Sequence, residues 1–148
     1  MKDQILNQID KALNWYNKNY KGYQDIEMLL NLSAKLALLN CNLVEILAES
    51  SKSYLSLYLD RKIMFAGFKL NYHSDGNSLA KSEELATKGI KDIKQKEIEA
   101  EVELLFLKEK RRAIEKVLQS VQQRISYLKQ EKNRMNISNN QENQKEFI

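Results

Sequence analysis

Basic residues gather in one stretch of this chain, KEKRRAIEKVLQSVQQR, from Lys108 to Arg124. Residues 108–134 contain nine basic and three acidic residues, although the 148-residue chain has a net charge of only +4. Lys and Arg side chains at this density suit the binding of phosphate groups, because each cation can replace a counterion of a nucleic acid. The same charges could instead offset acidic helices within a bundle, and the sequence leaves both alternatives open.

A second stretch, YLSLYLDRKIMFAGFKLNYH from Tyr54 to His73, alternates aromatic and basic residues. Single-stranded nucleic acid is held by cations that follow its phosphates and by rings that stack on its bases. Together the two stretches supply the candidate nucleic-acid-binding residues Arg61, Lys62, Lys69, Lys108, Lys110, Arg111, Arg112, Lys116 and Arg124. Tyr58 and Phe68 are the candidates for base stacking. Tyr58 and Phe65 also continue an apolar stripe, which favours burial of their rings.

The sequence offers no constellation typical of catalysis or of a metal site. With one histidine, His73, and one cysteine, the usual ligands of a zinc site are too few. Cys41 stands in the apolar run LALLNCNLVEIL, which predicts a small buried thiol. The acidic run from Glu97 to Glu103 has a spacing of two, which scatters its carboxylates around a helix and predicts solvated side chains. We therefore expect no enzyme, no metal and no cofactor.

The elements that must position these residues are long helices. The chain has no proline, four glycines and 30% charged residues, a composition typical of coiled coils. Helical spacing of apolar residues predicts one domain, residues 1–135, with helices over about residues 3–20, 24–69 and 78–135. Gly22 and the polar stretch NYHSDGNS, residues 71–78, mark the breaks. Residues 136–148 are rich in Asn and Gln and predict a disordered tail.

An apolar residue recurs every seven positions from Leu79 to Met135, which predicts a coiled-coil contact along the last helix. A second heptad series is half polar and includes Glu97 and Arg111, so a parallel dimer in register would stack like charges. These patterns predict an all-α fold: an elongated antiparallel helical hairpin or coiled-coil bundle with a short N-terminal helix. The side chains expected in its core on the last helix are Leu104, Leu107, Ile114, Leu118, Val121 and Ile125. Further apolar positions predict a homo-oligomer larger than a dimer.

The same patterns bear on location. No window approaches the roughly 18 uncharged apolar residues of a membrane span. The N-terminal stretch MKDQILNQID lacks the apolar centre of a signal peptide. We expect a cytoplasmic protein, or one of the host cytoplasm if a phage encodes it, with no membrane partner.

One family has a similar plan. A hydrophobic helix running into YLSLYLDRKIMFAGFK, then a polar break and a long helix closing with LQSVQQRISYLKQE, resembles the UvsY-type recombination mediators of phages over residues 30–132. The resemblance implies a helical oligomer that binds single-stranded DNA and helps a recombinase to displace single-strand-binding protein. The family's basic residues ahead of the break correspond to Arg61 and Lys62, but its preceding basic run is reduced here to Lys52. The alternative is a coiled-coil structural or adaptor protein, such as a virion or scaffolding component, without nucleic-acid binding.

Overall fold

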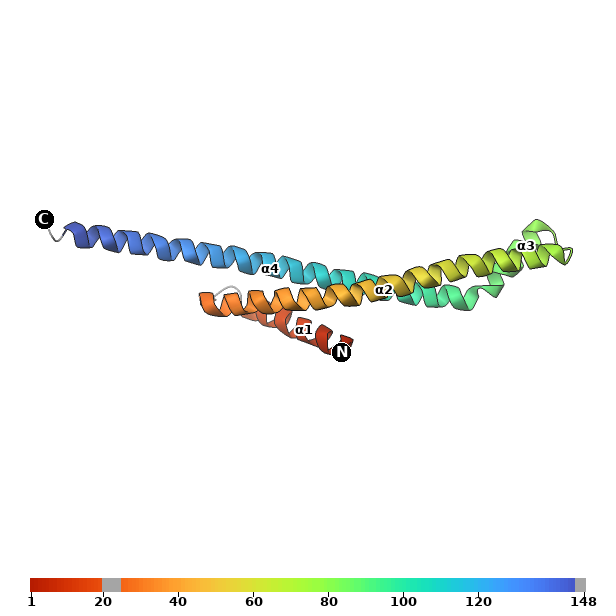
Figure 1. The fold of residues 1–148 in the computed structure, drawn as a ribbon, viewed down its shortest axis with the longest axis horizontal. Coiled ribbons are helices and arrows are strands. Elements are labelled where there is room, and N and C mark those ends of the chain that lie inside the picture. Colours follow the sequence, from red (N-terminus) through yellow and green to blue (C-terminus); the bar gives the residue numbers. More distant parts are fainter. Residues whose placement is uncertain (20–24, 146–148) are drawn as a thin grey trace. The chain divides into compact units, whose positions relative to one another are not determined.

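A computed structural model describes residues 1–19 and 25–145 of the chain (Figure 1). These residues form four helices: α1 (Lys2–Asn19), α2 (Ile26–Ser74), α3 (Leu79–Gly89) and α4 (Lys91–Lys145). No strand occurs in the described part of the chain. The predicted all-α class is confirmed.

The helices belong to two packed units, which we describe separately. Unit 1 contains residues 1–43 and 110–148, and unit 2 contains residues 44–109. Thus α2 and α4 contribute to both units, α1 belongs to unit 1, and α3 belongs to unit 2.

Unit 1 has a core built from heptad positions. On α2, Leu29, Leu36 and Leu43 are fully buried at a spacing of seven residues. On α4, Ile114 and Val121 are equally buried, again seven residues apart. Along the whole of α4, which contributes to both units, five of the six predicted core side chains are buried, and Leu118 is half-buried.

Unit 2 contains an antiparallel hairpin. Arg61 on α2 contacts Glu97 on α4, and Lys69 further along α2 contacts Glu83 on α3. Residue numbers therefore rise on one side of the hairpin while they fall on the other, which confirms the predicted antiparallel arrangement. The turn that reverses the chain is closed by Gly76, whose φ of 94° is left-handed.

The residues after α2 form a Schellman cap. The Asn77 amide donates to the Tyr72 carbonyl at 3.2 Å, and the Gly76 amide donates to the His73 carbonyl at 3.1 Å. Ser78 then caps α3, because its hydroxyl accepts a hydrogen bond from the Lys81 amide. This turn lies within the polar stretch that the sequence indicated.

The predicted helix over residues 78–135 is divided in two. The α3 helix ends at Gly89, and Ile90 follows with φ −94° and ψ 5°, outside the helical range of ψ. A Cβ on Gly89 would lie 3.1 Å from two atoms of the Phe68 ring. A glycine at this point allows the ring to approach the backbone, and glycine also weakens a helix locally. The heptad pattern passes through the break and gave no sign of it.

The ends of the long helices also differ from the predicted ones. Asp25 caps α2, since its carboxylate accepts hydrogen bonds from two amides of the first turn. The break expected at Gly22 lies outside the described residues. At the other end, α4 continues to Lys145, through most of the segment predicted as a disordered tail. No proline or glycine follows Gly89 to end the helix, and Ser138 donates to the Arg134 carbonyl within it.

One property of α2 departs from the sequence analysis. By length and composition, α2 is the one helix among the described residues that could cross a membrane: an 18-residue window has a mean hydropathy of 1.3, with 28% of it buried. The sequence-based expectation was that no segment of the chain comes near the composition of a membrane span, and α2 comes nearer to it than expected. The core helix of a soluble protein, or a signal sequence near the N-terminus, can have the same length and composition.

Candidate nucleic-acid interface

Arg61, a predicted phosphate ligand, forms an ion pair inside unit 2. Its Nε donates to Oε2 of Glu97, and its Nη2 donates to Oε1 at 3.3 Å. Glu97 is only 8% exposed, which corrects the prediction for this residue, whereas Glu99, Glu101 and Glu103 are exposed as predicted. Glu97 occupies the second heptad series and therefore faces α2. The hydrogen bond to Glu97 raises the pKa of Arg61. Because this ion pair joins α2 to α4, the guanidinium contributes to the packing of the two helices.

Three more of the predicted cations are also paired. The pairs are Lys69 with Glu83 at 2.5 Å, Lys110 with Asp10, and Arg111 with Glu115 at 2.8 Å. The first joins α2 to α3, the second joins α4 to α1, and the third lies within one turn of α4. A phosphate at any of these cations would compete with a carboxylate already in place.

The two predicted stacking residues have different surroundings. Tyr58 is half-buried, with Nζ of Lys62 4.6 Å and Cζ of Arg61 5.4 Å from its ring centroid. Both distances allow a cation–π interaction. Phe68 is half-buried against Gly89 at the break between α3 and α4. Its ring thus has a packing role in the hairpin.

The remaining predicted cations are Lys108, Arg112, Lys116 and Arg124. The first three are exposed and follow one another at a spacing of four, on one side of α4. Lys108 belongs to unit 2, and the other two belong to unit 1. Beyond Lys116, exposed polar residues continue along the same side of α4, at intervals of three or four residues.

We define the α4 outer face as the exposed side chains of unit 1 at this spacing: Arg112, Lys116, Gln119, Gln123, Ser126, Tyr127, Gln130 and Arg134. At 100° per residue, they lie on the side of α4 away from the buried Ile114 and Val121. None of its members is acidic. The two carboxylates that flank it, Glu115 and Glu131, accept hydrogen bonds from Arg111 and Tyr127.

Tyr127 is the one aromatic residue of this face. Its ring is 50% exposed, and Cζ of Arg124 lies 5.3 Å from the ring centroid. The hydroxyl donates to Oε1 of Glu131 at 2.7 Å, and this hydrogen bond raises the pKa of the phenol. A shallow depression beside the ring is lined by Gln119, Gln122, Gln123, Ser126, Tyr127 and Gln130. The ring can stack, and the amides can both donate and accept hydrogen bonds.

Arg124 is among the binding residues predicted from the sequence, whereas Tyr127 and the glutamines are not. A signal for them was present in QSVQQRISYLKQ, where polar residues recur every three or four positions between the apolar ones. Their spacing predicts a common helix face, but the charge count alone directed attention to the cations.

Other residue types that could carry chemistry do not form a site in the described part of the chain. No cluster of three or more His, Cys, Asp or Glu that could hold a metal ion occurs among the described residues. Cys41 is exposed, which corrects the predicted buried thiol. Its position on α2 lies five residues after the buried Leu36, so it points away from the core.

Comparisons of the chain with protein-family models, with curated proteins and with solved structures found no match. The resemblance to UvsY-type mediators therefore stays a hypothesis drawn from sequence pattern and length.

Proposed function

We propose that this protein is a non-enzymatic accessory protein that binds single-stranded DNA through the α4 outer face. The observation that carries the proposal is a contrast in charge pairing. Four predicted cations are paired with carboxylates. By contrast, two cations of the α4 outer face, Lys116 and Arg134, make no ion pair with the described residues, and the face has no acidic member. A phosphate can approach them without displacing a carboxylate.

The other members of the face favour a single strand over a duplex. Tyr127 can stack only on a base whose face is open, and such stacking is worth about 1–3 kcal/mol per base. The glutamine amides can hydrogen-bond base edges that a single strand leaves unpaired. From Arg112 to Arg134 the helix rises by about 33 Å, which is long enough for several phosphates. Residues 112–134 contain six basic and two acidic residues, so the segment attracts phosphate.

The wider role follows from the family resemblance. The protein would hold single-stranded DNA in the cytoplasm while a recombinase replaces single-strand-binding protein, and it would act by binding alone. Several copies would present several α4 outer faces to one strand. A surface suited to a second copy is the α2 outer face, which we define as the exposed apolar side chains Leu55, Leu59, Ile63 and Leu70.

A specific observation favours a second candidate, the coiled-coil structural or adaptor protein. The side chains of the α2 outer face are 54–69% exposed, as expected of a helix whose main role is to pack against other chains. Self-association is expected under both candidates. Binding of single-stranded DNA separates them.

The test is the fluorescence anisotropy of a labelled oligothymidylate titrated with the protein at about 50 mM salt. We expect binding with a slope of log affinity against log salt of about −2 to −3, from three or four phosphate contacts. The double variant Lys116→Glu/Arg134→Glu should bind at least about tenfold more weakly. The matched control is Lys94→Glu/Lys96→Glu, which makes the same charge change on α4 outside the face and should retain most of the affinity. Lys110 is unsuitable, because it pairs with Asp10.

Tyr127 provides an independent second variant. Tyr127→Ala should weaken binding about 5- to 150-fold if the ring stacks on one base. Tyr127→Phe keeps the ring, loses only the hydroxyl and should bind within about threefold of the parent. A parent protein that binds no oligonucleotide, or charge-reversed and control variants that bind alike, would favour the structural candidate.

A further inference from the structure

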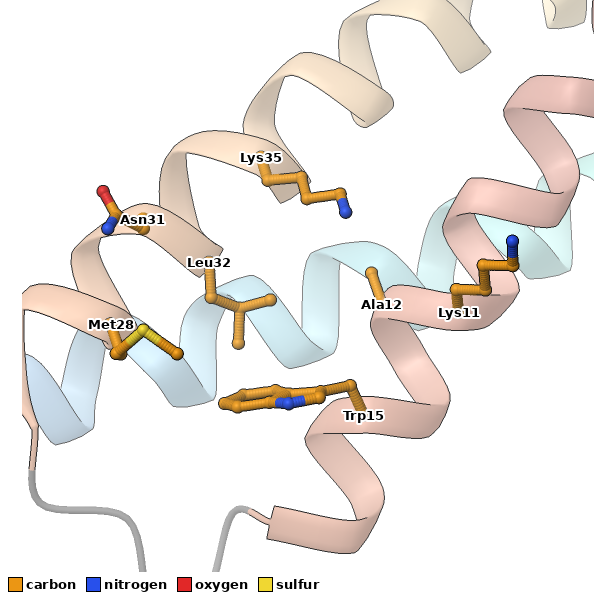
Figure 2. A pocket seen from close by; sticks show the side chains of 7 residues that line it. All are labelled: Lys11, Ala12, Trp15, Met28, Asn31, Leu32 and Lys35. Carbon is orange, nitrogen blue, oxygen red and sulfur yellow. The ribbon is translucent and has the colours of Figure 1, made fainter.

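A pocket opens between α1 and the first turns of α2, within unit 1 (Figure 2). Its volume is about 360 Å³. The lining residues are Lys11, Ala12 and Trp15 from α1, and Met28, Asn31, Leu32 and Lys35 from α2. The proposed DNA-binding surface uses none of them, so the pocket is a separate feature.

One part of the pocket is apolar. In Figure 2 the indole of Trp15 lies below Leu32, with Met28 at one end. Leu32 and Ala12 are buried and belong to the core of unit 1. Met28 is 42% exposed, although it is a large apolar side chain. An incoming apolar group can therefore cover Met28 and the indole without opening the core.

The other part of the pocket is positively charged. Lys35 extends from α2 toward Ala12, away from Met28, and Lys11 lies on α1 just beyond Ala12, with its amine pointing outward (Figure 2). Both side chains are exposed, and no carboxylate is among the lining residues. The neighbouring carboxylate of Asp10 is engaged by Lys110 of α4. Two cations beside an apolar cavity suit a ligand that joins an anion to an apolar group.

We propose that this pocket binds an acidic peptide, with the apolar side chain of its C-terminal residue against Trp15 and Met28. Lys11 and Lys35 hold the terminal carboxylate and the acidic residue next to it. An apolar side chain that anchors in a pocket within a charged rim is a common plan of peptide recognition. Electrostatic attraction by the two lysines adds specificity and speeds association.

The volume favours a peptide over a lipid. At about 360 Å³, the pocket lies near the lower end of the roughly 300–1,000 Å³ that is usual for small-molecule sites. That volume accommodates one aromatic or branched aliphatic side chain with part of its backbone. A long acyl chain would need an apolar channel, whereas Lys11 and Lys35 stand at one end of this pocket.

Trp15 is the only tryptophan of the chain, so its fluorescence reports on the pocket directly. The probe is a synthetic hexapeptide, Ser-Leu-Asp-Asp-Glu-Phe, with a free C-terminal carboxylate, titrated into the full-length protein. We expect a saturable change in Trp15 emission. The amidated peptide and the peptide ending in Ala should each bind about tenfold more weakly, since each lacks one of the two recognised groups.

Protein variants identify the site. Lys35→Glu and Met28→Ser should each weaken peptide binding about tenfold, and both positions are exposed, so the helical content seen by circular dichroism should not change. Lys94→Glu, the same charge change on α4, should bind like the parent. Equal binding of the free, amidated and Ala-terminated peptides, or of the Lys35→Glu and Lys94→Glu proteins, would overturn the proposal. Anionic vesicles that displace the peptide from the parent would also overturn it in favour of a lipid.

Discussion

At the scale of single residues, the ion pair of Arg61 with Glu97 ties a predicted DNA ligand to the stability of the hairpin. The side chains are 23% and 11% exposed, so both charges are largely removed from water. Such a pair stabilises the folded protein little more than an apolar contact of the same size would. Removal of one partner, however, leaves the other charge desolvated and unpaired, which is destabilising. Glu97 would be left in that state if Arg61 were truncated.

We predict that Arg61→Ala lowers the free energy of unfolding by about 2 kcal/mol, less than the loss of a fully buried pair because solvent still reaches both groups. Urea denaturation followed by circular dichroism measures the change. Lys62→Ala is the matched control: it removes an exposed cation one position along and should cost less than about 0.5 kcal/mol. Equal denaturation midpoints for the two variants would contradict the assigned role of the pair. After correction for folded protein, DNA affinity should be the same in Arg61→Ala and the parent.

At the scale of elements, the break between α3 and α4 depends on one glycine and one ring. Gly89 ends α3, and the Phe68 ring from α2 packs so close that a Cβ on Gly89 would lie 3.1 Å from it. The structure thus replaces one predicted helix by two, and the second begins at Lys91. Phe68, a candidate for base stacking in the sequence, belongs to this packing contact.

A double-mutant cycle tests the contact. In a Phe68→Ala background, Gly89→Ala should stabilise the protein by about 0.5–1 kcal/mol, because alanine favours the helix more than glycine does. In the parent, which keeps Phe68, Gly89→Ala should stabilise the protein by less than this or should destabilise it, because the new Cβ would lie 3.1 Å from the Phe68 ring. Thermal unfolding of the four proteins gives the coupling energy. An identical effect of Gly89→Ala in both backgrounds would show that Phe68 does not pack on Gly89.

At the scale of the whole molecule, the main question is what covers the α2 outer face. Leu55, Leu59, Ile63 and Leu70 recur at a spacing of four or seven residues, on the side of α2 away from Arg61. A second copy of the chain, as proposed above, would bury these side chains from water, and each leucine so buried contributes about 1.5–3 kcal/mol.

We predict that light scattering at micromolar concentration gives the parent a mass well above the 17.4 kDa of one chain. Leu59→Lys/Ile63→Lys should lower the mass toward that of one chain without loss of helicity, because both side chains are exposed. Asn71→Lys, also exposed on α2 but off the apolar stripe, is the control and should leave the mass unchanged. A monomeric parent, or one that sediments with liposomes, would contradict self-association through this face. The second outcome would assign the face to a membrane, as the hydropathy of α2 allows.

The sequence alone determined the all-α class, most of the helical segments and the turn after α2, because these depend on local interactions. Apolar residues every three to four positions fix a helical face, and the absence of proline allows long helices. Gly76 and Ser78 supply the left-handed residue and the N-cap that a turn between helices requires. The heptad series on the last helix also identified most of the buried side chains of α4. These features need no knowledge of distant residues.

Only the tertiary structure decided how the charged and aromatic side chains are used. Arg61 and Glu97 are 36 residues apart, and Lys110 and Asp10 are 100 apart, so no local pattern could pair them. In the sequence, a cation held by a carboxylate looks the same as a cation open to phosphate. The same holds for Phe68, whose contact with Gly89 exists only once α2 and α3 meet. Helix formation is set by neighbours along the chain, whereas the availability of a side chain depends on what folding brings beside it.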